Sequence, residues 1–197
     1  MRRFARCALL GLLCAFAPLH AGAQSQTASA DSVKAAFLYH FSGYVEWPQV
    51  SAGGPVTIGV MGSETIVGEL RQLLPGRSID GRPVRVRALS PDGNLSGLHV
   101  LFIGEREHRR ARQVIDALQG APTLTVTDHP EGLERGAMIN FVISDNRVRF
   151  EISQAQAERV GLRLSSRLLA VATRVRSTGV QLQRSPAMTA ANARPRA

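Results

Sequence analysis

The sequence predicts an α/β fold: a single domain with a mixed β-sheet flanked by helices and a β-hairpin in its C-terminal half. Between residues 56 and 128, short apolar runs alternate with amphipathic segments, as strands and helices do. Two strand-like segments follow, 137–144 and 147–153, and the pair Asp145-Asn146 between them suits a two-residue turn with positive φ. A chain of 197 residues without an internal repeat is long enough to bury one core.

Four segments before residue 130 have the pattern of strands. Three are apolar enough for the middle of a sheet: VTIGVMG (56–62), LHVLFIG (98–104) and TLTVTD (123–128). The fourth, PVRVRAL (83–89), alternates apolar and basic residues, which is typical of a half-buried edge strand. We expect Val84 and Val86 to face the core, and Arg85 and Arg87 to face water.

Four segments between and after these strands are predicted to be helical: 64–74, 107–120, 154–160 and 166–175. The first carries its large apolar residues on one side: Ile66, Leu70, Leu73 and Leu74. The second is expected to end at Gly120, because glycine is a frequent helix terminator. Gly161 separates the last two.

The stretch VKAAFLYHFSGYVEWP (33–48) holds five of the ten aromatic residues. Four apolar side chains recur at helical spacing and predict a core-facing stripe: Val33, Phe37, Phe41 and Tyr44. Leu38 and Val45 widen this stripe. Tyr39 lies off it, and Trp47 precedes Pro48, where the helix must end. These two are our candidates for contact with a partner protein; an aromatic cage for a quaternary amine is the less favoured alternative.

The N-terminus is predicted to be a cleaved signal peptide, residues 1–23. Three arginines precede an apolar run, which ends in the small-residue cleavage sequence AGA (21–23). The run is too short to span a bilayer, which disfavours an uncleaved anchor. Cleavage before Gln24 removes Cys7 and Cys14, so the exported chain has no thiol and no disulfide. We expect a soluble periplasmic protein.

The formal charge of +9 is concentrated at the two ends of the chain. Between Asp31 and Val175, 17 basic residues face 15 acidic ones, so the predicted domain (31–175) is nearly neutral. The segment 176–197 has four arginines and no acid, and we expect it to be a disordered basic tail. This distribution argues against nucleic acid as a partner.

Motifs for catalysis, metal binding or a cofactor are absent from the sequence. Gly62 and Ser63 lie at a strand-to-helix turn that could hold an anion, but the lysine of a P-loop and the pattern of a nucleophile elbow are missing. A tight turn with a serine helix cap is the favoured interpretation. Asp128-His129 follows a strand, where α/β sheets often bind ligands, although a turn alone explains the composition of TDHPEG. The histidines show no metal-ligand spacing.

Over residues 32–175, the sequence resembles the YfiR-type (YfiR/HmsC-like) family of small exported proteins. The resemblance begins with KAAFLYHFSGYVEWP and continues through VTIGVMG, IDGRPVRVR, LHVLFIG and LTVTD. It closes with GAMINFVISDNRVRFEIS and VGLRLSSRLLAVA, and the latter contributes Arg163 and Arg167 as further candidates for partner contact.

The resemblance implies a regulatory role without catalysis. By this resemblance, the chain would be a periplasmic repressor. It would bind the periplasmic domain of an inner-membrane diguanylate cyclase and lower cyclic-di-GMP synthesis and biofilm formation. An OmpA-like outer-membrane lipoprotein relieves the block by sequestering the repressor, and a homodimer is possible. Relatives can carry disulfides in the sheet. Here the corresponding positions are Gly59, Leu98, Leu133 and Asn140, which argues against redox sensing.

Two alternatives belong to other classes of protein. A sensor of a small ligand would bind at the strand ends, through Gly62, Ser63, Gly104, Asp128 and His129. A hydrolase of an unrecognised kind would need a cleft with a nucleophile and a base within hydrogen-bonding distance.

Overall fold

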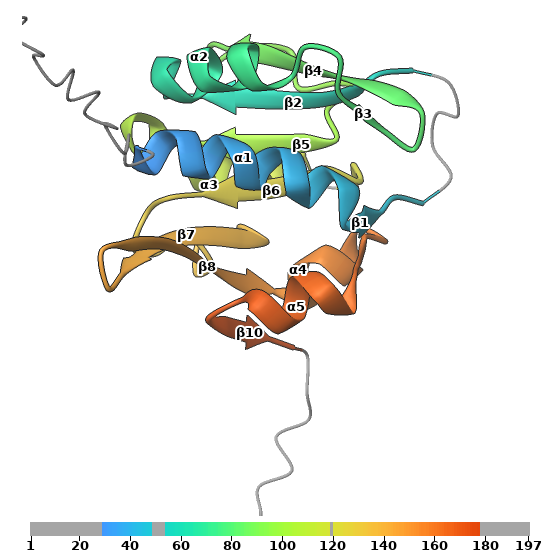
Figure 1. Ribbon diagram of the computed structural model, residues 1–197. Coiled ribbons are helices and arrows are strands. Elements are labelled where there is room, and N and C mark those ends of the chain that lie inside the picture. Colours follow the sequence, from blue (N-terminus) through green and yellow to red (C-terminus); the bar gives the residue numbers. More distant parts are fainter. Residues whose placement is uncertain (1–28, 49–53, 119, 178–197) are drawn as a thin grey trace, which may run out of the picture.

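The computed structural model describes residues 29–48, 54–118 and 120–177. The predicted signal peptide and residues 178–197 of the predicted tail lie outside these ranges. Within them the fold is α/β, as predicted, with one large mixed sheet between two layers of helices (Figure 1).

The eight strands of the large sheet are, in spatial order, β3 (Ser78–Ile79), β4 (Arg82–Leu89), β2 (Val56–Met61), β5 (Val100–Ile103), β6 (Leu124–Thr127), β7 (Ile139–Ser144), β8 (Arg147–Ser153) and β10 (Arg174–Arg176). The five strands β4-β2-β5-β6-β7 are parallel, whereas β3 and β8 run antiparallel to their neighbours β4 and β7. The strands β5 and β6 occupy the middle, and all of their side chains are buried between the helices that cover the two faces.

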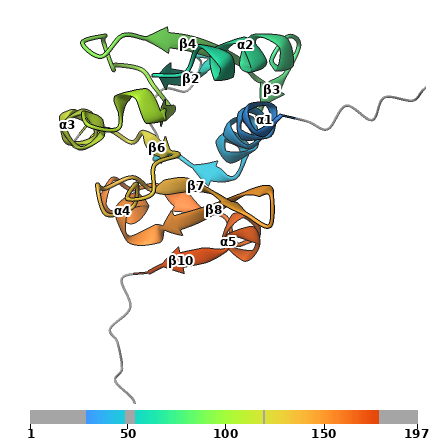
Figure 2. The ribbon, with the colours of Figure 1, turned by 90° about the vertical axis from the view of Figure 1, so that its left-hand side faces the viewer.

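The helices divide between the two faces of this sheet (Figure 2). One face carries α1 (Ala30–Gly43), α2 (Glu64–Leu73) and α5 (Ser166–Val171). The other carries α3 (Ala111–Ala117), preceded by the 3-10 turn η1 (Glu105–Glu107), and α4 (Gln154–Arg159). A separate two-stranded sheet pairs β1 (Val45–Glu46) with β9 (Arg163–Leu164).

The predicted hairpin is confirmed. Strands β7 and β8 pair antiparallel from Ile139–Ile152 to Ser144–Arg147. Asp145 and Asn146 form the turn, with φ angles of 52° and 57°. Short polar side chains tolerate this left-handed conformation, which matches the twist of the flanking strands.

Helix α1 buries a face that is rotated from the predicted stripe. Phe41 is 1% exposed, as expected, and Leu38 is fully buried beside it. Val33 and Phe37 are only partly buried, and Tyr44 is 39% exposed because it lies beyond the last helical turn as the C-cap. The rings of Phe37 and Phe41 nevertheless pack against the two phenylalanines of the hairpin, Phe141 and Phe150.

Two predicted helices are shorter than expected. The segment 107–120 forms a helix only over Ala111–Ala117, because no side chain caps its start at Arg110. The segment 166–175 leaves the helix after Val171, and 174–176 becomes β10, parallel to the edge of β8. Thr173 starts this departure by donating from both its backbone nitrogen and its hydroxyl to the Phe150 carbonyl. Arg176, the first residue of the predicted tail, therefore lies in a strand.

The prediction for the edge strand β4 is correct for Val84, which is buried, and for Arg85, which is exposed. Arg87 does not simply face water. Its Nη2 donates to the carbonyls of Asn94 (3.0 Å) and Ser96 (2.9 Å), so this arginine holds the following loop against β4.

Candidate functional site

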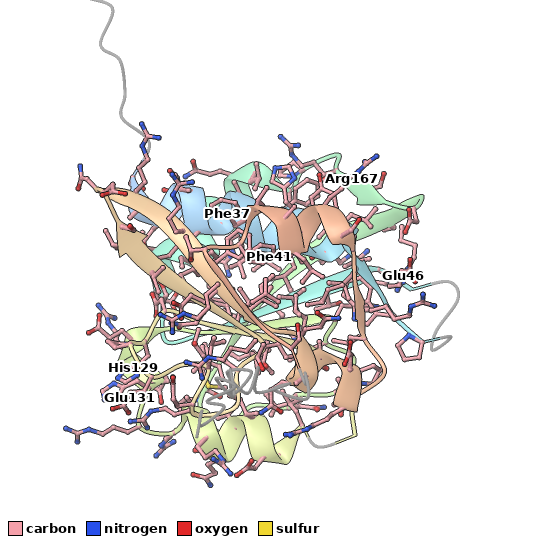
Figure 3. The ribbon with its side chains drawn as sticks, turned by 90° about the horizontal axis from the view of Figure 1, so that it is seen from below. Phe37, Phe41, Glu46, His129, Glu131 and Arg167 are labelled. Atoms are coloured by element: carbon pink, nitrogen blue, oxygen red, sulfur yellow. The ribbon has the colours of Figure 1, made fainter. Side chains whose placement is uncertain are left out.

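The ligand-binding and partner-binding candidates lie at opposite ends of the sheet. Figure 3 shows His129 and Glu131 at one end, and Glu46 and Arg167 toward the other. The first end is formed by the carboxyl ends of the parallel strands. There the chain reverses its winding between β2 and β5, because α2 covers one face of the sheet and α3 the other. Such a switch point is where open α/β sheets commonly bind ligands.

The switch point between β2 and β5 is closely packed. Gly62 has φ +76°, and a Cβ added there would lie 3.0 Å from Cγ of Glu107. Gly104 is equally confined, since its Cβ would lie 3.0 Å from the Gly62 carbonyl oxygen. The Ser63 hydroxyl accepts a hydrogen bond from the Ile66 backbone nitrogen (3.3 Å), which makes it the N-cap of α2. The serine-cap interpretation is therefore correct.

Asp128 and His129 follow β6 at the same end, but their side chains contact different residues. Nζ of Lys34 donates to Oδ2 of Asp128 (2.7 Å), which ties the start of α1 to the end of β6. The His129 ring stacks on His108, with centroids 4.7 Å apart. Asp128 and Lys34 line a cavity of about 480 Å³ beside the hairpin. Asp128 is thus held by α1, whereas His129 stacks on the turn whose Glu107 packs against Gly62.

The opposite end of the molecule joins two segments that are far apart in the sequence. Val45 pairs with Leu164, Glu46 pairs with Arg163, and the Ser165 backbone nitrogen donates to the Tyr44 carbonyl (3.0 Å). The structure thereby places the residues after α1, which include Trp47, beside the segment that carries Arg163 and Arg167. We call the surface of Tyr44, Glu46, Trp47, Arg163 and Arg167 the β1–β9 corner.

Charge at the β1–β9 corner is open to solvent. The Nε atom of Arg163 lies 3.6 Å from a carboxylate oxygen of Glu46, and the two side chains are 83% and 74% exposed. Arg167 is also exposed, in the first turn of α5. A surface pair of this kind adds little to stability. The charges of Arg163 and Arg167 can therefore be changed with little effect on the stability of the fold.

Tyr39 does not reach the β1–β9 corner. Its hydroxyl donates to the Ser78 carbonyl (3.4 Å), and the Arg77 guanidinium lies 5.2 Å from its ring centroid. Tyr39 therefore packs between α1 and the start of β3, and it is half-buried there.

His99, which was not among the candidates predicted from the sequence, packs against Trp47. The indole and the imidazole meet edge-on, with centroids 5.7 Å apart. Two N–H donors face the ring nitrogens: Thr57 N lies 3.2 Å from Nδ1, and Arg82 Nη2 lies 2.9 Å from Nε2. Burial lowers the pKa of His99, and the Arg82 charge lowers it further. The only signal in the sequence was a histidine at the start of an apolar strand.

Within the described ranges, histidine, cysteine, aspartate and glutamate form no group of three that could hold a metal ion. None of the described helices is long and apolar enough to cross a membrane.

Together, the fold and these surfaces define a small doubly wound α/β domain. Its candidate partner-binding residues at the β1–β9 corner come from segments that the pairing of β1 with β9 brings together. The chain belongs to the YfiR/HmsC-like family, whose model matches residues 31–173. Membership is consistent with a periplasmic regulatory protein of cyclic-di-GMP signalling. No curated protein matches the chain.

Among solved structures, the chain is similar to the ABC domain from Streptococcus pneumonia in complex with L-Trp. The TM-score is 0.51 at 11% sequence identity, and the match covers 74% of this chain and 60% of that one. At this identity the likeness concerns the fold alone.

Proposed function

We propose that this chain is a non-enzymatic periplasmic regulator that binds the periplasmic domain of an inner-membrane diguanylate cyclase and represses cyclic-di-GMP synthesis. An OmpA-like outer-membrane lipoprotein would relieve repression by competing for the regulator. Family membership supports the regulatory class. The cyclase and the lipoprotein come from the family resemblance.

The observation that carries the proposal is the pairing of β1 with β9. It builds one surface from the two segments that carry the ends of the family resemblance, EWP and RLSSR. That surface presents Tyr44, Trp47 and two arginines, and tyrosine, tryptophan and arginine are the residue types that dominate binding energy at interfaces. The charges of Arg163 and Arg167 are exposed and contribute little to the stability of the fold. This supports a role for both residues in binding a partner.

A binding measurement with the purified cyclase domain tests this assignment. Arg163→Glu and Arg167→Glu each reverse an exposed charge in the corner, and we expect each to weaken binding by about tenfold or more. Arg147→Glu is the matched control, because Arg147 is also exposed and lies beside the turn of the hairpin. Equal losses in all three variants would argue against the β1–β9 corner.

A small-ligand sensor is the second candidate, and the cavity beside Asp128 is the observation that favours it. A ligand that fills this cavity would raise the melting temperature by mass action. Screening periplasmic metabolites by thermal shift, with Asp128→Asn as the comparison, tests it; shifts that Asp128→Asn leaves unchanged would exclude this cavity.

A further inference from the structure

The positive charge of the folded domain is concentrated in one short segment. Between Arg71 and Arg87 there are five arginines and a single acid, Asp80. The remainder of residues 31–175 holds twelve basic and fourteen acidic residues. The nearly neutral domain is therefore polarised, with a basic region formed by the end of α2, β3 and β4, at the top of Figure 1.

Two of the five arginines are half-buried and hydrogen-bonded to other segments of the fold. Arg82 donates through Nε to the Gly54 carbonyl (2.7 Å) and through Nη2 to His99. Arg87 holds the loop after β4, as described above. Their charges are half-buried and already serve to fix backbone positions.

The other three, Arg71, Arg77 and Arg85, are exposed and line one cavity of about 540 Å³. The other lining residues include Ser78, Pro83, Val84 and Val86, and no carboxylate lines the cavity. None of the three arginines forms an ion pair with a described residue. A concave surface with three unpaired cations favours an anionic occupant.

The same cavity lies along an open sheet edge. Strand β3 pairs with β4 only at Arg82 and Pro83, and the Arg77 carbonyl accepts from Val84. From Arg85 to Leu89, β4 pairs with β2 on its inner side and has no described strand on its outer side. An edge strand of this kind presents backbone donors and acceptors to which an extended peptide can add.

We propose that the arginine-lined edge of β4 is a second docking surface, which takes an extended, carboxylate-rich segment of a partner protein. Backbone pairing to β4 supplies the register, and carboxylates on the two faces of the added strand meet Arg71 and Arg77 on the α2 side and Arg85 on the opposite side. Tyr39 borders this surface through its contact with Arg77, so its exposed edge joins this surface instead of the β1–β9 corner. Repression through the β1–β9 corner does not depend on this second surface, because the two surfaces share no residue.

A peptide is the occupant that fits both features. Phosphate headgroups of a membrane would satisfy the arginines, but they cannot pair with the backbone of β4. The probe is therefore a fluorescently labelled peptide in which pairs of glutamates alternate with pairs of valines, so that both faces of the strand carry carboxylates. It is titrated with the full-length mature protein and followed by anisotropy. The same peptide with N-methylated valines keeps the charges but loses the backbone donors.

We expect the peptide to bind, with affinity that falls as salt is raised because screening weakens exposed ion pairs. The double variant Arg71→Gln/Arg85→Gln should weaken binding by about tenfold or more. Neither substitution removes the contacts of Arg77 with Leu73 and Tyr39. Arg147→Gln/Arg149→Gln is the matched control, since it removes two exposed charges from the hairpin; it should bind as the unaltered protein does.

Three outcomes would overturn the proposal. Equal losses in the two double variants would mean that only net charge matters. Undiminished binding of the N-methylated peptide would exclude strand addition. Binding to phosphatidylglycerol vesicles through Arg71 and Arg85, without binding of the peptide, would identify a membrane face instead.

Discussion

The indole of Trp47 meets the imidazole of His99 edge-on, with ring centroids 5.7 Å apart and planes inclined at 69°. This contact connects the β1–β9 corner to the start of β5. A neutral imidazole offers one lone pair, and the protonated ring offers none. Because the N–H groups of Thr57 and Arg82 both face the ring nitrogens, protonation of His99 replaces attraction with repulsion at this junction.

Trp47 is the only tryptophan in the chain, so its fluorescence reports on His99. We expect emission to fall on acidification, because a protonated imidazole quenches an adjacent indole. The midpoint should lie below about 6.5, the ordinary histidine pKa, since burial and then Arg82 lower the pKa of His99. His99→Asn should abolish the transition and His129→Asn should preserve it. A midpoint above 6.5, or a transition that survives His99→Asn, would contradict this assignment.

The lowered pKa of His99 also determines how the stability of the fold depends on pH. The unfolded chain binds the His99 proton more readily than the folded one, so acid favours unfolding. This contribution is fully present above about pH 6.5 and is lost as the pH falls toward the folded-state pKa. Urea unfolding of the protein and of His99→Asn at several pH values should give curves that converge on acidification; curves that diverge would reverse the sign.

Phe41→Ala should destabilise the fold by about 3–5 kcal/mol, because its buried ring leaves a cavity among Phe37, Phe141 and Phe150. Phe37→Ala should cost less, since Phe37 is only partly buried. Tyr39→Ala should also cost less than Phe41→Ala, because Tyr39 is half-buried and packs only at the margin of the core. Chemical denaturation gives all three values. If Tyr39→Ala unfolds the protein as severely as Phe41→Ala, Tyr39 is a core residue and not a contact residue.

Local patterns predicted the elements that local chemistry controls. The apolar runs of β2, β5 and β6, the Asp145-Asn146 turn and the Ser63 cap all follow from residues near one another in the chain. Strands β1, β3, β9 and β10 were missed, because two or three residues carry no periodicity. In β1, β9 and β10 the strand character also comes from distant partners.

For the candidate sites, too, single residues could be predicted from the sequence, but their positions relative to one another could not. Trp47 and the arginines of RLSSR were singled out separately, but their proximity depends on the pairing of Glu46 with Arg163. The candidates at the strand ends were expected to form one site. The structure adds two contacts there, Glu107 against Gly62 and Lys34 on Asp128, and neither has a signature in the sequence.

Gly132→Ala should be strongly destabilising. Thr127 Oγ1 donates to Asn140 Oδ1 in the buried interior, and a Cβ at position 132 would overlap both side chains. Gly68→Ala is the control, because the Cβ there meets nothing within 4 Å and alanine favours the helix α2 by about 1 kcal/mol. Thermal unfolding should therefore show a lower melting temperature for the first variant and a higher one for the second. A neutral Gly132→Ala would mean that the loop over Asn140 is free to move away.

Reductant should not change the melting temperature of the mature protein. Both cysteines, Cys7 and Cys14, precede the predicted cleavage point, so the chain from Gln24 has no thiol to exchange. Leu98 and Leu133, at positions where relatives can carry cysteines, are buried and fill core volume. Calorimetry with and without dithiothreitol tests this. A reductant-dependent shift would mean that the signal segment is retained.

The central claim is repression of a diguanylate cyclase through the β1–β9 corner, and cyclic-di-GMP in a deletion strain tests it most directly. Deletion of the gene should raise the nucleotide level, and the unaltered protein should restore it. Arg163→Glu/Arg167→Glu, secreted at an equal level, should fail to restore it, whereas the hairpin variant Arg147→Glu should succeed. An unchanged nucleotide level in the deletion strain, with a candidate cyclase expressed, would contradict the account and favour the ligand sensor.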